Sequence, residues 1–321
     1  MIDFSVAICT YNGEKRLPEV LDKLRDGCAY TTTLENSAQS LSWEIIVVDN
    51  NSTDNTAKVL KDYQADWPSS YPLKYCFEPQ QGQAFARQRA IVEAQGEFVG
   101  FLDDDNLPTP DWVVAAYTFG KEHPKAGAYG GQIHGDFEDN PPEEIKSIVA
   151  YYLAIVERGP KAHQYLKKGV LPPGAGIVVR KQAWCENVPK KIFFTGRVGK
   201  SLMACEDLEV LSYIQNAGWE IWYNPQMHMY HKIPRTRLER DYLIALVRGN
   251  GLAKNRIRML RMKPWQRPLA LPVYMLNDLR QIILKSIKYR SVIKTDIAAA
   301  CEIELLKASL ISPFYLLKRN L

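Results

Sequence analysis

The sequence predicts an α/β fold in which a wound, mostly parallel sheet is flanked by helices and followed by a basic, helical C-terminal extension. Two observations predict it. Short apolar runs alternate with helical patterns over residues 4–102, and a helical periodicity takes over after Leu238. Alternating strands and helices favour parallel strands joined by right-handed crossovers. With 321 residues, 46% apolar and 24% charged, the composition is that of a globular protein with one large domain or two smaller ones.

The elements expected in the first half follow one another regularly. Apolar runs predict the strands, and 3.6-residue periodicity predicts the helices between them. In order these are a strand at 4–10, a helix carrying Leu17 to Leu24, a strand at 43–49, a helix carrying Val59 and Leu60, a strand at 74–77, a helix at 84–94 and a strand at 97–102. The polar turn after the second strand offers Ser52 or Thr53 as the cap of the next helix.

The second half carries weaker signals. Residues 126–230 are expected to be less regular, with Gly- and Pro-rich turns and one helix at 206–216. From Leu238 onward the pattern is helical, and Leu276, Leu279, Ile283 and Ile287 fall on one face between basic residues.

Charge is divided unevenly along the chain. Residues 232–321 hold 19 Lys and Arg against 6 Asp and Glu, which leaves 22 against 30 in the first 231 residues. Seven basic residues lie between Arg248 and Arg267 without an acid, interleaved with Trp265 and other apolar residues. This pattern fits contact with an anionic membrane surface, and equally a solvated helical face without a partner. Nucleic acid also attracts basic patches, but we expect no nucleic-acid partner.

The chain shows no sign of membrane insertion or export. Its longest stretch without Asp, Glu, Lys or Arg runs only from Ile221 to His231, far below the roughly 18–20 apolar residues of a spanning helix. Strand-like residues begin at Asp3, where a secretion signal would be basic and then apolar. The six scattered cysteines form no CxxC pair, as expected of reduced thiols. We therefore expect a cytoplasmic protein, peripheral at the inner face of the cytoplasmic membrane if the basic region binds lipid.

Three polar segments follow strands of the predicted sheet: 10–14, 49–54 and 103–105. Ligands of wound sheets bind at the carboxyl ends of the strands, where these segments should meet. The three consecutive carboxylates Asp103–Asp105 repel one another unless a cation lies among them. Hard oxygen ligands suit Mg²⁺ or Mn²⁺ together with substrate phosphates. A metal–diphosphate site is one hypothesis, and a solvated, turn-forming cluster before Leu107-Pro108 is the other.

Four motifs in order resemble the hallmarks of family 2 glycosyltransferases. They are Cys9–Glu14, Val48–Asp54, Phe101–Pro108 and Cys205–Leu208, followed by Gly218-Trp219, Tyr223–Pro225 and His231. The resemblance covers about residues 3–235. It implies a GT-A domain at 1–235, with a nucleotide-binding half at about 1–125 and an acceptor half at about 126–235, followed by a basic helical region at 236–321. It also implies a nucleotide-diphosphate sugar held through a metal, and transfer with inversion.

Carried over by position, the resemblance implies a donor site. Its nucleotide-sugar contacts would be Thr10, Tyr11 and Glu14 for base and ribose, Asp49 and Asn50 for a pyrimidine, Arg87 for the diphosphate, and Asp103 and Asp104, the latter for a ribose hydroxyl. Asn50 departs from the family's usual second Asp, and Gln88 after Arg87 departs from the usual Asn. The metal ligands would be Asp103, Asp105 and His231, with Asp105 the direct ligand and His228 the alternative to His231.

The same resemblance implies the catalytic pair. An inverting transfer is a single displacement, so one general base must take the proton of the acceptor hydroxyl. Asp207 matches the second acid of the family's Glu-Asp pair and is the expected base. Glu206 would raise the pKa of that base or bind the acceptor. A simpler interpretation is that both acids favour the positive end of a helix dipole.

The Gly-rich stretch Gly174–Arg180 resembles the family segment on the acceptor side, or is simply a tight turn. Trp184, Trp219 and Trp222 are candidates for stacking on acceptor rings, or else core residues.

The sequence thus predicts an inverting, metal-dependent transferase that uses a UDP-sugar and extends a glycan or lipid-linked acceptor in surface polysaccharide synthesis. One alternative is a sugar-phosphate nucleotidyltransferase, which needs a Gly-rich, basic first loop that 10–16 lacks. The other is a catalytically silent scaffold that binds nucleotide sugar or membrane.

Overall fold

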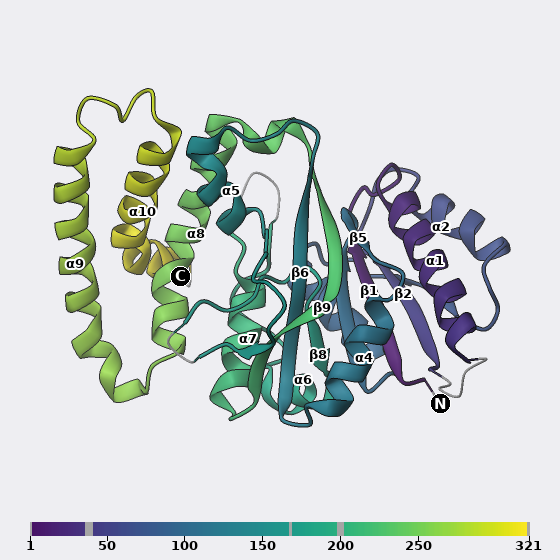
Figure 1. Cartoon of the computed structure of the whole chain (residues 1–321). Helices are drawn as coiled ribbons and strands as arrows, with labels where there is room; N and C mark the ends of the chain where they lie inside the picture. The colour runs from purple at the N-terminus through teal and green to yellow at the C-terminus, as the bar shows by residue number, and fades with distance from the viewer. Residues whose placement is uncertain (1, 36–40, 167–168, 198–201, 320–321) are drawn as a thin grey trace.

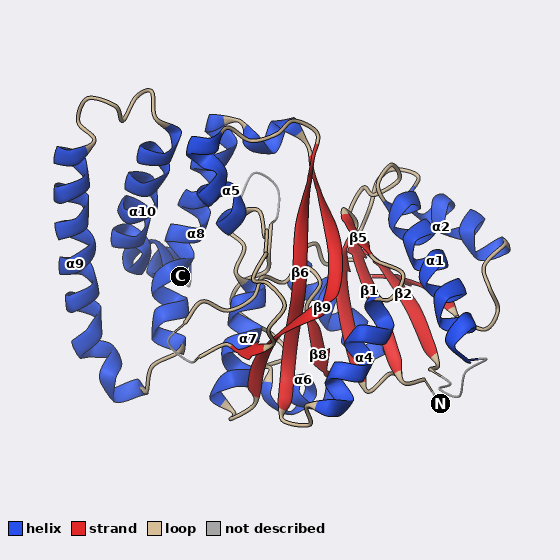
Figure 2. Cartoon of the chain, in the orientation of Figure 1, coloured by secondary structure: helices blue, strands red, loops and turns tan. Residues whose placement is uncertain are grey.

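The computed structural model describes residues 2–35, 41–166, 169–197 and 202–319. Within these residues nine strands form one mixed sheet in the order β3-β2-β1-β4-β8-β6-β9-β5, with β7 paired to β9 (Figure 2). The strands are β1 (Phe4–Thr10), β2 (Trp43–Asp49), β3 (Leu73–Phe77), β4 (Phe98–Asp103), β5 (Asn106–Pro108), β6 (Ala126–Phe137), β7 (His163–Gln164), β8 (Val178–Arg180) and β9 (Glu220–Ile233). The predicted α/β fold with a mostly parallel sheet is confirmed.

The first four strands of this sheet are parallel, as their alternation with helices predicted. Every residue of β1 and β2 is buried, which is why both are mostly apolar. Two buried polar residues within them, Ser5 and Glu44, hydrogen bond each other. The intervening helices are α1 (Leu17–Glu35), α2 (Thr56–Ala65), α3 (Gln83–Glu93) and α4 (Trp112–Glu122). The expected cap of α2 was wrong: Asn55 directly precedes the helix, and no side chain caps it there. Ser52 and Thr53 lie earlier, where the Ser52 hydroxyl accepts a hydrogen bond from the Asn12 amide and the Thr53 hydroxyl donates to Asn12 Oδ1.

Strand register brings the polar segments together. Thr10 pairs with Asp49 between β1 and β2, and Cys9 pairs with Asp103 between β1 and β4. Because these strands are parallel, their carboxyl ends form one edge. The loops that follow β1, β2 and β4 meet there, as predicted.

The middle of the chain is more regular than expected. The strands β6 and β9 run parallel to each other over most of their length, with a register shift between Gly130 and Gln132. The Gly-Gly step and Pro225 therefore lie at an irregularity within two long strands instead of in turns. Three helices accompany them: α5 (Lys146–Tyr152), α6 (Lys181–Asn187) and α7 (Glu206–Asn216), of which α7 was predicted.

The basic C-terminal region is helical, as predicted. It contains α8 (Arg240–Leu260), α9 (Arg267–Lys288) and α10 (Ile297–Arg319). Short 3₁₀ turns precede α8 (η2, Arg235–Leu238) and α9 (η3, Pro264–Gln266), and another precedes α5 (η1, Glu143–Ile145). In Figure 1 these helices stand at the end of the molecule opposite α1 and α2, and α9 is outermost. Among the residues described, no helix combines the length and apolar character needed to span a membrane.

Several cations of the basic segment pair with acids of the C-terminal helices or of α7. Arg256 pairs with Glu209 at 3.1 Å, Arg258 pairs with Asp278 at 2.9 Å, and Arg248 approaches Glu304 at 3.6 Å. The segment from Arg248 to Arg267 therefore holds the C-terminal helices together as well as carrying surface charge.

Candidate active site

A cleft of about 1130 Å³ opens at the carboxyl edge of the sheet and extends toward α8 and α10. The turn between β4 and β5 lines one side of it, and the first turn of α7 lines another. Of the residues predicted for the site, those that line the cleft are Tyr11, Arg87, Asp103, Asp104, Asp105, Glu206, Asp207 and His231.

Asp104 is held by two neighbours from the first loop. Its carboxylate accepts a 2.6 Å hydrogen bond from the Thr10 hydroxyl and two 2.8 Å bonds from the guanidinium of Arg16. A β-carbon at Gly13 would lie 2.0 Å from the Thr10 hydroxyl oxygen, so only glycine fits beside this contact. Thr10 and Asp104, predicted for the nucleotide, thus bind each other and fix the first loop against the acidic turn.

Glu14, Asp49 and Asn50 tie the neighbouring loops together. Glu14 accepts hydrogen bonds from the backbone and side-chain nitrogens of Asn55, and Asp49 accepts one from the Tyr75 hydroxyl at 3.0 Å. The Asn50 amide donates to the carbonyls of residues 78 and 80, and its oxygen accepts from the amide of residue 82 at 2.7 Å. An amide can serve both sets of partners where a carboxylate could only accept, which gives a structural reason for Asn at this position.

Asp105 and His231 converge on one cation, the guanidinium of Arg237. Arg237 donates to Asp105 Oδ2 at 2.8 Å and to His231 Nε2 at 3.0 Å, and these two acceptor atoms are 3.6 Å apart. His231 Nδ1 lies 2.8 Å from the Leu153 carbonyl oxygen. That nitrogen must therefore carry the hydrogen, which leaves the lone pair on Nε2 facing Asp105. Burial alone would raise the pKa of Asp105, but the hydrogen bond and positive charge of Arg237 hold it below its ordinary value.

These two side chains fit a divalent cation. A carboxylate oxygen and an imidazole nitrogen whose other nitrogen donates to a carbonyl form a common ligand pair. The described residues contain no cluster of three or more His, Cys, Asp or Glu placed to hold a metal. A metal held by Asp105 and His231 would therefore complete its shell with water and substrate phosphates, as Mg²⁺ and Mn²⁺ do.

Asp103 has other partners than that pair and faces Arg87. Its carboxylate accepts a 2.8 Å hydrogen bond from the Gln83 amide and lies 3.7 Å from the Arg87 guanidinium. Burial raises the pKa of Asp103 above its ordinary value, and Arg87 opposes that shift. Asp103 and Asp105 thus have different hydrogen-bond partners, and the assignment of both to the metal stays a prediction.

The backbone of Gly174 joins Arg87 to Asp207. Its carbonyl accepts a hydrogen bond from Arg87 at 3.2 Å, and its amide donates to Asp207 Oδ2 at 2.7 Å. A β-carbon here would lie 2.6 Å from Arg87 and 2.8 Å from Asp207. The small residue of this stretch therefore allows the backbone to approach two site side chains.

Glu206 is buried beside Asp207, and one of its carboxyl oxygens, Oε2, has no hydrogen-bond partner among the described residues. It begins α7 directly after Cys205, whose φ of +104° is rare for a residue other than glycine. Burial, and next the charge of Asp207, raise the pKa of Glu206 to about 7.

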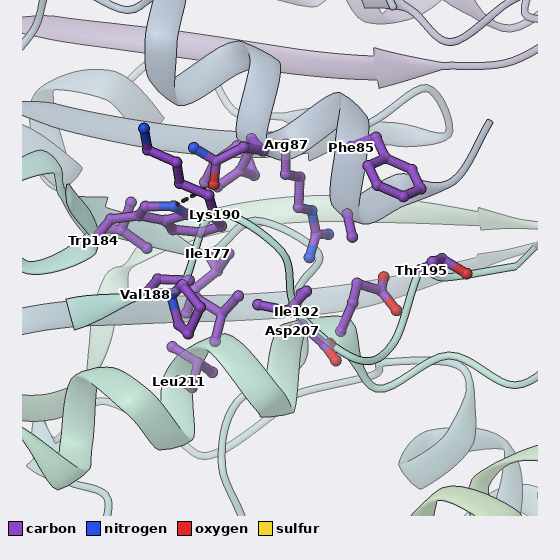
Figure 3. Close-up of a pocket in the computed structure, with 17 residues that line it drawn as sticks. Phe85, Arg87, Ile177, Trp184, Val188, Lys190, Ile192, Thr195, Asp207 and Leu211 are labelled. Carbon is purple, nitrogen blue, oxygen red and sulfur yellow. Dashed lines mark hydrogen bonds between the residues drawn. The ribbon is translucent and has the colours of Figure 1, made fainter. Parts of the chain in front are cut away.

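An apolar pocket of about 20 Å³ explains part of this burial. Figure 3 shows Arg87 and Asp207 at its edge, on the side facing an apolar wall. The wall includes Ile177, Trp184, Val188, Ile192 and Leu211. Such surroundings disfavour the ionised form of a carboxyl group.

Sequence reasoning missed three charged or polar side chains at this site: Arg16, Gln83 and Arg237. Each looks like an ordinary surface residue in the sequence, because its partner is far along the chain.

Two alternatives left open by the sequence can be compared with the structure. His228 hydrogen bonds His134 at 3.0 Å, so His231 is the histidine that faces the acids. Trp184, a candidate either for stacking on acceptor rings or for the core, is buried, and its indole N–H donates a hydrogen bond to the Gln88 side chain.

Comparison with family models identifies the chain. The model described as "Glycosyl transferase family 2" matches residues 5–184, more than half of the sequence. The chain belongs to glycosyl transferase family 2. This family 2 glycosyltransferase resembles "Glucosyl-dolichyl phosphate glucuronosyltransferase" of Haloferax volcanii, with 24% identity over 80% of this chain and 77% of that protein. It also resembles "Succinoglycan biosynthesis protein ExoM" of Rhizobium meliloti, with 22% identity over 75% of this chain and 71% of that protein.

Solved structures bear out the fold of this family 2 enzyme. The mannosyltransferase PcManGT from Pyrobaculum calidifontis, in complex with GDP-Man and Mn²⁺, has a TM-score of 0.59 and 18% identity, covering 97% of this chain and 87% of that chain. S. aureus TarS 1–349 in complex with UDP-GlcNAc has a TM-score of 0.52 and 17% identity, covering 98% and 92%. The expected GT-A fold is confirmed.

Proposed function

We propose that this enzyme moves a sugar from a nucleotide-diphosphate sugar, a UDP-sugar in our assignment, to a glycan or lipid-linked acceptor in surface polysaccharide synthesis. The transfer inverts the anomeric carbon and depends on Mg²⁺ or Mn²⁺. The observation that carries the proposal is the cleft, which has Asp105 and His231 on one side and Glu206 and Asp207 on another.

The donor would occupy the part of the cleft between the first loops and Arg87, in the half formed by about residues 1–125. Arg87 is buried, its Nε has no partner among the described residues, and its planar guanidinium suits phosphate oxygens. Asp105 and His231 would hold the metal, which stabilises the charge that gathers on the leaving diphosphate. Arg237 would then have to give up at least one of its two contacts there.

The acceptor would enter from the half formed by about residues 126–235. Asp207 is the proposed general base, and its Oδ2 is oriented by the Gly174 amide. As the acceptor oxygen bonds to the anomeric carbon, Asp207 takes the hydroxyl proton and the nucleoside diphosphate leaves from the opposite face. The protonated form of Glu206 would limit repulsion between the two acids, or Glu206 would bind the acceptor.

The acceptor class rests on the relatives. One acts on a dolichyl phosphate glycan by its name, and another serves succinoglycan biosynthesis. A lipid-linked acceptor would place this enzyme at the inner face of the cytoplasmic membrane.

Nucleotide binding tests the proposal directly. The thermal unfolding midpoint is measured with UDP, GDP and dTDP, each with and without Mn²⁺, for the wild type and for Asp105→Ala. We expect one nucleotide to raise the midpoint in a Mn²⁺-dependent way, with the effect lost in Asp105→Ala. If no nucleotide raises it, the donor site is wrong and a scaffold role becomes the better interpretation.

A further inference from the structure

The helix α9 has its apolar side turned toward solvent. Six residues of this side are exposed, and every step between them is three or four positions, so they lie on one face. They form what we call the outward face of α9: Leu269, Val273, Leu276, Leu279, Ile283 and Ile287. At 1.5 Å per residue this face is about 27 Å long.

The opposite side of α9 is the polar one, and it packs against the protein. Asp278 is buried there, where it accepts hydrogen bonds from Arg258 at 2.9 Å and from the Ser309 hydroxyl at 2.6 Å. Tyr274 lies under the Arg258 guanidinium, and Lys285 pairs with Glu302. A surface helix normally buries its apolar stripe and exposes its polar side. The reversal in α9 indicates that its apolar face has a partner outside the chain.

The positive charge around the outward face indicates which kind of partner it binds. From residue 263 to residue 294 the sequence has seven Lys and Arg and one acid, the buried Asp278. Arg280 projects from the face itself, Lys263 and Lys288 lie near its ends, and Trp265 is exposed one turn before the helix. Two copies related by a two-fold axis would bring these cations together, which disfavours a dimer through this face. Anionic lipid headgroups would complement them, and tryptophan suits the interface of a bilayer.

We propose that the outward face of α9 binds the surface of an anionic lipid bilayer, with the helix lying in the plane of the membrane. In Figure 1 α9 stands at the end of the molecule, clear of the sheet. The catalytic cleft reaches toward it, because Arg258, which pairs with Asp278 of α9, also lines that cleft. Docking would thus bring a lipid-linked acceptor near the cleft; this consequence alone rests on the proposed function.

Vesicle sedimentation of the full chain tests the proposal. Vesicles of phosphatidylcholine and phosphatidylglycerol in a three-to-one ratio are compared with vesicles of phosphatidylcholine alone. We expect the wild type to bind the anionic vesicles and Leu276→Glu to lower the partition coefficient by about tenfold or more, because a leucine no longer enters the apolar layer. Val92→Glu on α3 is the matched control, since Val92 and Leu276 are both 67% exposed, and it should bind as the wild type does.

A second variant, Arg280→Glu, should lower binding to the anionic vesicles while leaving the thermal midpoint unchanged. The proposal is overturned if the wild type does not sediment, if Leu276→Glu sediments equally well, or if the wild type forms a dimer that Leu276→Glu abolishes. Nucleotide binding is measured on the same preparations. A wild type that does not bind the vesicles but keeps Mn²⁺-dependent nucleotide binding would refute the membrane face and leave the proposed transferase standing.

Discussion

Replacing Glu206 with Gln should stabilise the enzyme at neutral and alkaline pH. The carboxyl group of Glu206 is buried, its Oε2 has no partner in the described structure, and its pKa is raised to about 7 from an ordinary 4.5. Folded protein therefore holds this proton more tightly than unfolded protein does. The free energy of unfolding falls as the pH rises from about 4.5 to about 7, and it stays lowered above that range.

The size of the effect follows from the shift. A difference of about 2.5 pKa units corresponds to about 3 kcal/mol at 1.36 kcal/mol per unit. Near pH 4.5 Glu206 is protonated in the wild type, and a protonated Glu has nearly the same shape as the Gln of the variant. Both proteins should therefore be equally stable there. Above pH 7 the variant should exceed the wild type by up to about 3 kcal/mol.

Urea unfolding of metal-free enzyme at several pH values between 5 and 8 measures this difference. Glu144→Gln is the control, because Glu144 is exposed and its replacement should leave the pH dependence as it is in the wild type. A Glu206→Gln difference that is constant across the pH range would refute the reasoning. It would mean that Glu206 is ionised over the whole pH range and that neighbouring groups balance its charge.

Three further predictions concern the chemistry. Asp207→Asn should lower kcat by about 10²-fold or more while leaving nucleotide affinity nearly unchanged, and normal turnover in this variant would exclude Asp207 as the base. Gly174→Ala should reduce kcat by about 10²-fold, because its β-carbon displaces Arg87 and Asp207; wild-type kinetics would show that the contact is not needed. Arg237→Ala should bind Mn²⁺ at least about tenfold more tightly in calorimetry without nucleotide, because no guanidinium occupies Asp105. Equal or weaker Mn²⁺ binding would contradict that competition.

The sequence predicted the parts of the fold that depend on local pattern. The strands β1, β2 and β4 are mostly apolar because they are buried, and each ends where its polar loop begins. Their parallel pairing then brought the loops together without further information. The strands β6 and β9 were missed, in part because Gly130-Gly131 resembles a turn signal and lies at an irregularity within paired strands.

The residues that sequence reasoning missed at the site depend on long-range packing. Arg237 meets Asp105 across 132 positions, and Arg16 meets Asp104 across 88. Nothing near either arginine in the sequence distinguishes it from a solvated one. Five of the acids that the motif resemblance singled out line the cleft: Asp103, Asp104, Asp105, Glu206 and Asp207. The cations that pair with them are visible only once the loops are folded together.

The first turn of α7 concentrates features that oppose stability. Cys205 holds a left-handed backbone, Glu206 lacks a partner for one buried oxygen, and the Gly174 backbone approaches so closely that a β-carbon would collide with Asp207. A helix start that served packing alone would be more stable with a capping side chain and a solvated first turn. Here Glu206 lies against an apolar wall, and the carboxylate of Asp207 is oriented by the backbone amide of Gly174. Two adjacent acids are thereby given different environments, which is what separate roles in proton transfer require. This corner therefore favours an active transferase over a silent scaffold, and the pH dependence of Glu206→Gln tests the physical basis of that inference.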